Sequence, residues 1–271
     1  MFTMVGAAVD IPHRIHKMLG NLGPKLYFLR VPKNKKDEDT YFGQLTKLED
    51  FKKNKKEVEE ALLDYLAWFD RCLDSIEENN IQKFAWDGDK DEEKTLRAII
   101  KLSKLLAHLR GNVPTWETHD SQGSEYAYSL PTIEEPDRAM SQLRNLARGH
   151  ALSRGRNYIT KDDLGLVISV VLSTAMKERV AIFDLLIQNQ GQLTTSQITE
   201  YLNASKPTAR RTMAEFKALG IVTLKNGNNN EEHKITLKSE FAWFLSDEFK
   251  ESVKEKSPIS SDIDKTGTVE L

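Results

Sequence analysis

The sequence predicts a mostly α-helical protein that begins with two short β-strands and ends with three helices and a two-stranded wing. Three observations support this class. Apolar residues recur at intervals of three and four over much of the chain, the period of helices with one buried face. An Asn-Gly dipeptide separates two short extended runs near the C-terminus. The composition, 39% hydrophobic and 30% charged, suits a polar, helix-rich chain.

Residues 1–32 are expected to form a strand, a short helix and a second strand. The apolar runs "MFTMVGAAV" and "PKLYFLRV" suit buried strands, and "HRIHKMLGNLG" lies between them. Two strands alone do not form a stable sheet. We therefore expect the end of a sheet whose other strands are missing or belong to another chain. Residues 33–50 are polar and are expected to be a linker.

Residues 51–177 are predicted to form a helical domain. Two apolar stripes predict its first two helices: Val58, Leu62, Tyr65, Phe69, Cys72 and Ile76, then Leu96, Ile99, Ile100, Leu105, Leu106 and Leu109. The segment 112–136 is expected to be a structured loop, and a third helix to begin near Pro136, with Leu143 on its apolar side. A fourth helix follows "ITKDDL", where Thr160 is the expected N-cap and Asp163 lies in the first turn.

Residues 178–249 show the pattern of a winged helix-turn-helix. A helix with an apolar side is followed by a second, "TTSQITEYL", and a third, "SKPTARRTMAEFKAL". The runs "IVTLK" and "HKITLK" flank "NGNNNEE" as a hairpin, which completes three helices and a wing. "FAWFLSDEF" is expected to be a closing helix. Residues 250–271 are polar and are expected to form a disordered tail.

The third of these helices carries the residues expected to bind DNA. Ser205 is the predicted N-cap, and Pro207 fits the first turn. One face is expected to be buried: Ala209, Met213, Phe216 and Leu219. The opposite face places two arginines among small alanines, which would let the helix approach a groove wall.

The candidate DNA-binding residues are Ser205, Lys206, Thr208, Arg210, Arg211, Lys217 and Lys225. Between residues 203 and 225, five basic side chains face the single acidic Glu215, a local charge of +4 in a chain of net −2. Arginine forks suit guanine edges or phosphates, and a helix N-terminus suits phosphate oxygens. The alternative is a solvated basic face on a helix that only packs. The three-helix-and-wing context favours DNA, expected to be double-stranded.

Two resemblances extend this interpretation. "TTSQITEYLNASKPTARRTMAEFKALGIV" resembles the winged-helix domains of bacterial and archaeal regulators, in which Ser-x-x-Thr-x-Arg opens the recognition helix. "EPDRAMSQLRNLARGHALSRGRNYITKDDL" resembles the lid of AAA+ ATPases of the minichromosome maintenance and MoxR type over about thirty residues. That resemblance implies a nucleotide-sensing role for Arg138, which falls on the sensor-2 arginine that reaches the γ-phosphate.

The N-terminal run "FTMVGAAVDIP" resembles the strand that ends the nucleotide-binding sheet in mobile-element AAA+ proteins. Lys25 stands where such families often carry an arginine, and a lysine lacks the forked donors of an arginine finger. No Gly-x-x-x-x-Gly-Lys-Ser/Thr phosphate loop occurs in the chain. We therefore expect no ATP hydrolysis by this chain alone. ATP and Mg²⁺ would belong to a complete ATPase, in which a partner or a further part of the protein supplies the phosphate loop.

Other patterns add no catalytic residue and no metal site. His13 and His16 lie three residues apart, but no third ligand is near them in the sequence. The single cysteine, Cys72, excludes an internal disulfide framework and fits a reducing compartment. The longest apolar run, 164–172, is too short to span a bilayer, and no signal peptide is visible. We therefore expect a cytoplasmic protein without a membrane partner.

Three functions follow from these patterns. The first is the DNA-binding C-terminal module, lid plus winged helix, of an AAA+ or helicase-like ATPase. The second is a free-standing winged-helix transcriptional regulator whose helical half serves dimerisation or sensing. The third is a protein–protein interaction module with an incidental basic face. A homo-oligomer is compatible with the first two.

Overall fold

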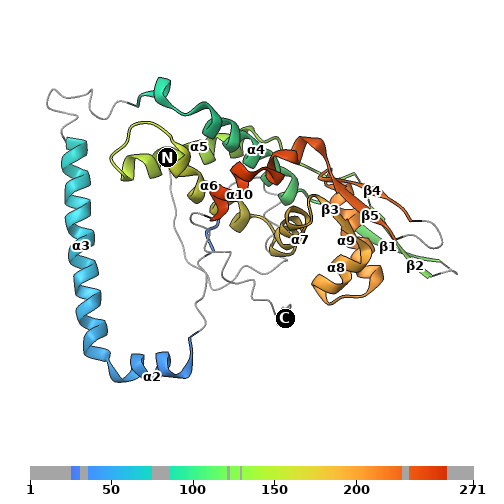
Figure 1. The fold of residues 1–271 in the computed structure, drawn as a ribbon, viewed down its shortest axis with the longest axis horizontal. Coiled ribbons are helices and arrows are strands. Elements are labelled where there is room, and N and C mark those ends of the chain that lie inside the picture. The colour runs from blue at the N-terminus through green and yellow to red at the C-terminus, as the bar shows by residue number, and fades with distance from the viewer. Residues whose placement is uncertain are drawn as a thin grey trace.

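The computed structural model of the chain describes residues 26–30, 36–74, 86–120, 123–128, 130–227 and 232–254. Over these residues the protein is mostly helical, as predicted, with a small three-stranded sheet and a separate hairpin. Figure 1 shows the helices from α4 onward gathered into one body, with the sheet at one end of it. Helices α2 and α3 extend along the opposite edge.

The elements run in the following order along the chain. They are α2 (Glu38–Thr46), α3 (Leu48–Asp74), η1 (Gly88–Lys90), α4 (Glu93–Arg110), β1 (Thr115–Asp120), β2 (Gly123–Tyr128), α5 (Asp137–Ser153), η2 (Lys161–Asp163), α6 (Leu164–Thr174), α7 (Lys177–Gln188), β3 (Gln192–Thr194), α8 (Thr195–Leu202), α9 (Lys206–Ala218), β4 (Val222–Lys225), β5 (Lys234–Leu237), η3 (Ser239–Leu245) and α10 (Asp247–Lys254).

A single hydrophobic core runs from α4 to α10. Helices α5 and α6 pack against α4, and the same cluster of buried side chains continues through α7, α9 and the small sheet. The predicted stripe of α4 is confirmed at Ile99, Leu105, Leu106 and Leu109, whereas Ile100 is exposed. The helical half and the winged helix therefore share one core rather than two cores joined by a linker.

The turn before α6 is held by a network of charged and polar side chains. Thr160 is the N-cap, as predicted, and it also forms a capping box with Asp163, whose Oδ2 accepts a hydrogen bond from the Thr160 N–H at 2.9 Å. The buried Asp163 also accepts hydrogen bonds from Arg156 at 2.8 and 3.0 Å, and His150 Nδ1 lies 2.7 Å from its Oδ1. Burial alone would raise the pKa of Asp163, but hydrogen bonds from Arg156, Thr160 and His150 outweigh it and lower that pKa. His150 is therefore half-buried and hydrogen-bonded to a carboxylate.

The small sheet has three strands instead of the predicted two. Its order is β3-β5-β4, and both pairs are antiparallel. Leu193 of β3 lies opposite Ile235 of β5, and both side chains are buried. β3 was missed because three residues are too few to show the alternation of a strand, and its pairing depends on residues about forty positions away.

The predicted N-terminal strand is wrong at residues 26–30, the part of it that the structure describes. These residues have no strand pairing, and the backbone N–H of Phe28 donates instead to the hydroxyl of Thr174 at 3.0 Å. The Arg30 guanidinium donates to the carbonyl of Ala175 at 3.0 Å. The segment therefore docks on the end of α6 without a sheet to join. The first predicted strand, Lys25, His13 and His16 lie outside the described residues.

Two further predictions need correction. The segment 112–136 is not only loop, because β1 and β2 form an antiparallel hairpin with Thr115 opposite Tyr128. The predicted closing helix is divided into η3 and α10, with a break at Ser246, and α10 extends to Lys254, into the predicted tail. Phe241, Phe244 and Phe249 of these elements are buried in the core.

The long helix α3 is present as predicted, but its apolar stripe is not buried. Val58, Leu62 and Tyr65 are all exposed. The stripe has the period of a packed helix, yet the body covers little of it.

Candidate nucleic-acid interface

The helix-turn-helix is built from α8, a tight turn and α9. The capping box of Thr194 and Gln197 starts α8, since each side chain bonds to the other residue's backbone N–H. Asn203 then adopts a left-handed conformation, with φ of 46°, which asparagine tolerates better than most residues. Ser205 caps α9 by accepting a hydrogen bond from the N–H of Thr208 at 3.4 Å. The sequence thus sets both the ends of the helices and the turn between them.

The inner face of α9 is buried as predicted. Ala209, Met213, Phe216 and Leu219 all have 0% exposure. The hydroxyl of Thr195, at the start of α8, contacts Met213 Sδ at 3.5 Å. Gly220 ends the helix with φ of 75°, a conformation that favours glycine, and leads directly into β4. The outer face of α9 is therefore fixed in direction by a fully packed inner face.

Two contacts join the end of α4 to α7 and α9. Arg179, 6% exposed, donates from Nη1 to the carbonyls of Leu109 and Gly111, each at 2.7 Å. Its Nε and Nη2 bond to Oε1 of Glu215. His108 Nδ1 lies 2.6 Å from the carbonyl oxygen of Leu219. In the sequence, Glu215 was the one acidic residue counted against the five basic ones. In the structure its negative charge is neutralised by Arg179, on the side of α9 that faces the body.

The outer face of α9 presents most of the predicted DNA-binding side chains to solvent. Lys206, Arg210, Arg211 and Lys217 are all exposed. They run from the first to the last turn of a helix of 13 residues, which is about 20 Å long. Ala214 is only partly covered and lies between the arginines and Lys217. The outer face of α9 is therefore positively charged along its length, and the small side chain of Ala214 would let the helix backbone come close to a groove wall.

The first turn of α9 differs from the expected simple phosphate site. The hydroxyl of Thr208 lies 3.0 Å from that of Ser205, so these two predicted contacts already interact with each other. Glu232, at the end of the wing loop, bonds to the hydroxyl of Ser196. That bond, with a smaller effect of the Lys206 charge, lowers the pKa of Glu232 and keeps it ionised. Lys206 therefore has an acidic neighbour that the sequence did not reveal.

The wing contains a basic residue that sequence reasoning missed. Lys225, a predicted contact at the end of β4, is exposed and lies directly opposite Lys234 of β5. Like charges at opposed positions destabilise a hairpin, so the pair costs stability unless an anion neutralises it. Val222 pairs with Leu237, and this register of the two strands places Lys225 opposite Lys234. The sequence alone does not give the register, so it did not show that the two lysines face each other.

The predicted nucleotide-sensing residue Arg138 belongs to a different helix from the predicted DNA-binding residues of α9. Arg138 is exposed in the first turn of α5. Burial raises the pKa of both Glu134 and Tyr27, and the nearby charges of Arg110 and Arg138 partly oppose this. Arg138 is thus close to Tyr27, in the segment that follows Lys25. Across the described ranges, no three potential metal ligands come together, and no helix has the length and apolar character needed to cross a membrane.

Comparison with known protein families selects the same part of the chain. Residues 179–227 match the model of the DeoR-like helix-turn-helix domain. The matched segment begins at Arg179, includes α8 and α9, and ends just beyond β4. No match was found among curated proteins or among solved structures. The chain carries a winged helix-turn-helix module of the DNA-binding type, whereas its resemblance to AAA+ lids gains no support from these comparisons.

Proposed function

We propose that the protein is a transcriptional regulator that binds double-stranded DNA by inserting α9 into the major groove. The observation that carries this proposal is the division of α9 into a fully buried apolar face and an exposed cationic face within the segment that matches a helix-turn-helix family. A major groove about 12 Å wide accepts one α-helix, whose outward side chains then reach base edges.

The residues of the exposed face suit different parts of the duplex. Arg210 and Arg211, in the middle of the accessible face, have forked donors that match guanine edges or phosphate oxygens. Lys217, in the last turn, suits a phosphate of the groove wall. The hydroxyls of Ser205 and Thr208 would face another phosphate at the helix N-terminus. Because the whole chain has a net charge of −2, affinity must come from this local surface and should depend strongly on salt.

The wing would make a second contact beside the recognition helix. Lys225 and Lys234 place two positive charges at one level of the hairpin. A DNA backbone there would relieve their repulsion, as an anion does between two cations. Arg179 and Glu215 support this arrangement because they tie α9 to the body that also carries the sheet.

The test is binding to duplex DNA by fluorescence anisotropy, first with a pool of random duplexes to select a site. The R210A/R211A variant should lose at least about tenfold in affinity for the selected site and melt like the wild type, since exposed substitutions usually change stability by less than about 0.5 kcal/mol. The K94A/K104A variant is a matched control that removes two exposed positive charges from α4. Equal binding by all three proteins would reject DNA recognition by α9 and favour a protein-binding module.

One observation favours a second candidate, the C-terminal module of an AAA+ ATPase. The segment 26–30, which follows the ATPase-like N-terminal run, docks on Thr174 and Ala175 at the end of α6, and Tyr27 lies near Arg138. ATP binding by a complex of this chain with a partner that carries a phosphate loop, measured by calorimetry and weakened in R138A, would support this candidate over the regulator.

A further inference from the structure

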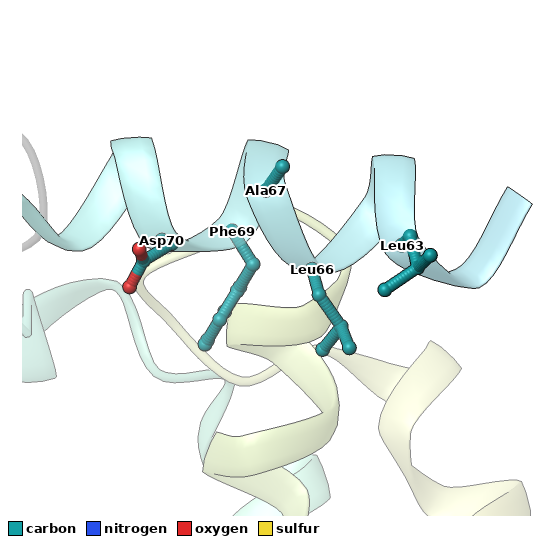
Figure 2. A pocket seen from close by; sticks show the side chains of 5 residues that line it. All are labelled: Leu63, Leu66, Ala67, Phe69 and Asp70. Atoms are coloured by element: carbon teal, nitrogen blue, oxygen red, sulfur yellow. The ribbon is translucent and has the colours of Figure 1, made fainter. Parts of the chain in front are cut away.

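Helix α3 presents an apolar surface that the rest of the described chain leaves uncovered. The large side chains on it are about half or more exposed: Phe51 65%, Val58 66%, Leu62 54%, Leu63 65% and Leu66 49%. Leu63, Leu66 and Phe69 also line an open hollow along the helix, and in Figure 2 Leu66 and Phe69 project from the same side of α3 while Ala67 points to the opposite side. A contiguous exposed apolar surface of this kind marks an interaction site. We call these five exposed residues the α3 apolar face.

The body of the protein contacts the C-terminal half of this helix, including Tyr65 of its apolar stripe. The Tyr65 hydroxyl donates to the carbonyl of Ser153 at 3.0 Å, and the Trp68 ring lies beside Gly155. Each of these two side chains is 39% exposed, less than any of the five residues of the α3 apolar face. The contact holds the C-terminal half of α3 near the end of α5, whereas its N-terminal half extends away from the body with α2 (Figure 1).

The sequence of α3 indicates what could cover the apolar face. Val58, Leu62, Tyr65 and Phe69 follow one another at intervals of four, three and four, the spacing by which two helices pack side by side. Three exposed ion pairs between residues four apart, Lys53–Glu57, Lys55–Glu59 and Lys56–Glu60, support the helix itself. A helix of 27 residues is about 40 Å long, enough for several layers of packed side chains.

The charges of α3 are segregated along its length. Residues 48–56 contain four lysines and two acidic residues, a net charge of +2, whereas residues 57–74 contain six acidic residues and one arginine, a net charge of −5. Two copies packed in parallel would place like halves together. Two antiparallel copies place the basic half of each helix against the acidic half of the other, and opposite charges across a helix pair select orientation in this way.

We propose that the α3 apolar face binds the same face of a second copy of this chain, and that the two α3 helices run antiparallel in a homodimer. The occupant is a second copy because one helix supplies both the apolar surface and the two complementary charge halves. The pairing requires no DNA, so it stands or fails independently of the function proposed above. A dimer would place two copies of α9 on one assembly.

Sedimentation of the full chain without DNA tests the dimer. The wild type should have twice the mass of one 30.9 kDa chain at micromolar concentrations. L62D and V58D should each be monomeric with unchanged melting of the body, because neither side chain belongs to the core. L130D is the matched control, since Leu130 is 91% exposed and lies outside α3, and it should remain a dimer. A wild-type monomer at every concentration, or dimeric L62D and V58D, would overturn the proposal and leave another protein or another part of this chain as the occupant.

Oxidative cross-linking tests the orientation. In an antiparallel pair that aligns residues 48–56 of each helix with residues 57–65 of the other, the two copies of Cys72 are about 45 Å apart, far beyond the roughly 7 Å between Cα atoms that a disulfide allows. The wild type should therefore not cross-link, whereas V58C in a C72S background, close to the centre of the paired segments, should do so. Cross-linking of the wild type through Cys72 would overturn the antiparallel arrangement.

Discussion

Arg179 and Glu215 are joined by two hydrogen bonds to one carboxylate oxygen, at 2.9 Å from Nε and 2.6 Å from Nη2. The remaining terminal nitrogen, Nη1, donates to the carbonyls of Leu109, near the end of α4, and of Gly111, which follows the helix. The side chain of Arg179 is 7% exposed and that of Glu215 is 31% exposed. Four hydrogen bonds to protein atoms therefore replace those that the guanidinium would form with water in the unfolded chain. One buried residue thus fixes α4, α7 and α9 relative to one another, and the direction of the cationic face of α9 depends on it.

Removal of this guanidinium should destabilise the whole body. R179A leaves the Glu215 carboxylate and two carbonyls without their donor, and breaking a buried ion pair in this way costs about 3–5 kcal/mol. The measurement is urea denaturation followed by circular dichroism. R97A is the control, because Arg97 forms a 2.6 Å ion pair with Glu93 in which both side chains are mostly exposed. Such pairs contribute about 0–1 kcal/mol, so similar decreases in the two variants would contradict the role given to Arg179.

Asp184 of α7 should make the protein less stable as the pH rises. Burial raises its pKa from 3.8 to about 6. Below about pH 4 the carboxyl is protonated in both the folded and the unfolded chain. Between about pH 4 and 6 the unfolded chain releases this proton while the folded chain retains it, so stability falls, and above about pH 6 the decrease is complete. A difference of about two pKa units corresponds to a penalty of the order of 3 kcal/mol at neutral pH.

The D184N variant tests this penalty because it removes the titration while keeping the shape. The variant should gain stability over the wild type between about pH 4 and 6.5, and the difference should then stay constant up to about pH 8. Thermal melting in a series of buffers measures it. Parallel pH profiles for the two proteins would show that Asp184 titrates in the folded state as it does in the unfolded state.

The core of the helical half should be sensitive to truncation at the residues that the apolar stripes predicted. Leu106 and Leu143 are both at 0% exposure, so L106A and L143A should each cost about 2–5 kcal/mol. L130A, which changes an exposed leucine in the same way, should melt like the wild type. If all three variants melt together, the stripe of α4 does not form the core that the structure places there.

Features that depend on residues close together in the sequence were predicted correctly, whereas contacts between residues far apart in the sequence were missed. The cap at Ser205 and the inner face of α9 were predictable because they depend on residues within four positions of each other. The link between Arg179 and Glu215 spans thirty-six positions and leaves no local pattern. The hairpin 115–128 lacks regular apolar alternation, so composition alone indicated a loop. The α3 stripe was detected, but periodicity shows only that a helix has an apolar face, and it does not show which surface covers that face.

Lys225 and Lys234 give a prediction in which DNA binding and stability change in opposite directions. Their Cα atoms are direct partners across the wing, so replacing both with threonine should remove a repulsion and add good strand formers. K225T/K234T should therefore be as stable as the wild type or slightly more so. If both lysines bind phosphate, its affinity for duplex DNA should fall, and the slope of log affinity against log salt should decrease by about 1 for each phosphate that the variant no longer neutralises. Preference among DNA sequences should remain, because α9 is unchanged.

The control is T223A/T236A, which changes the cross-strand pair two positions along the same hairpin without altering charge. It should preserve the wild-type salt slope. An unchanged slope in K225T/K234T would show that the wing does not touch the DNA backbone and that α9 binds without it.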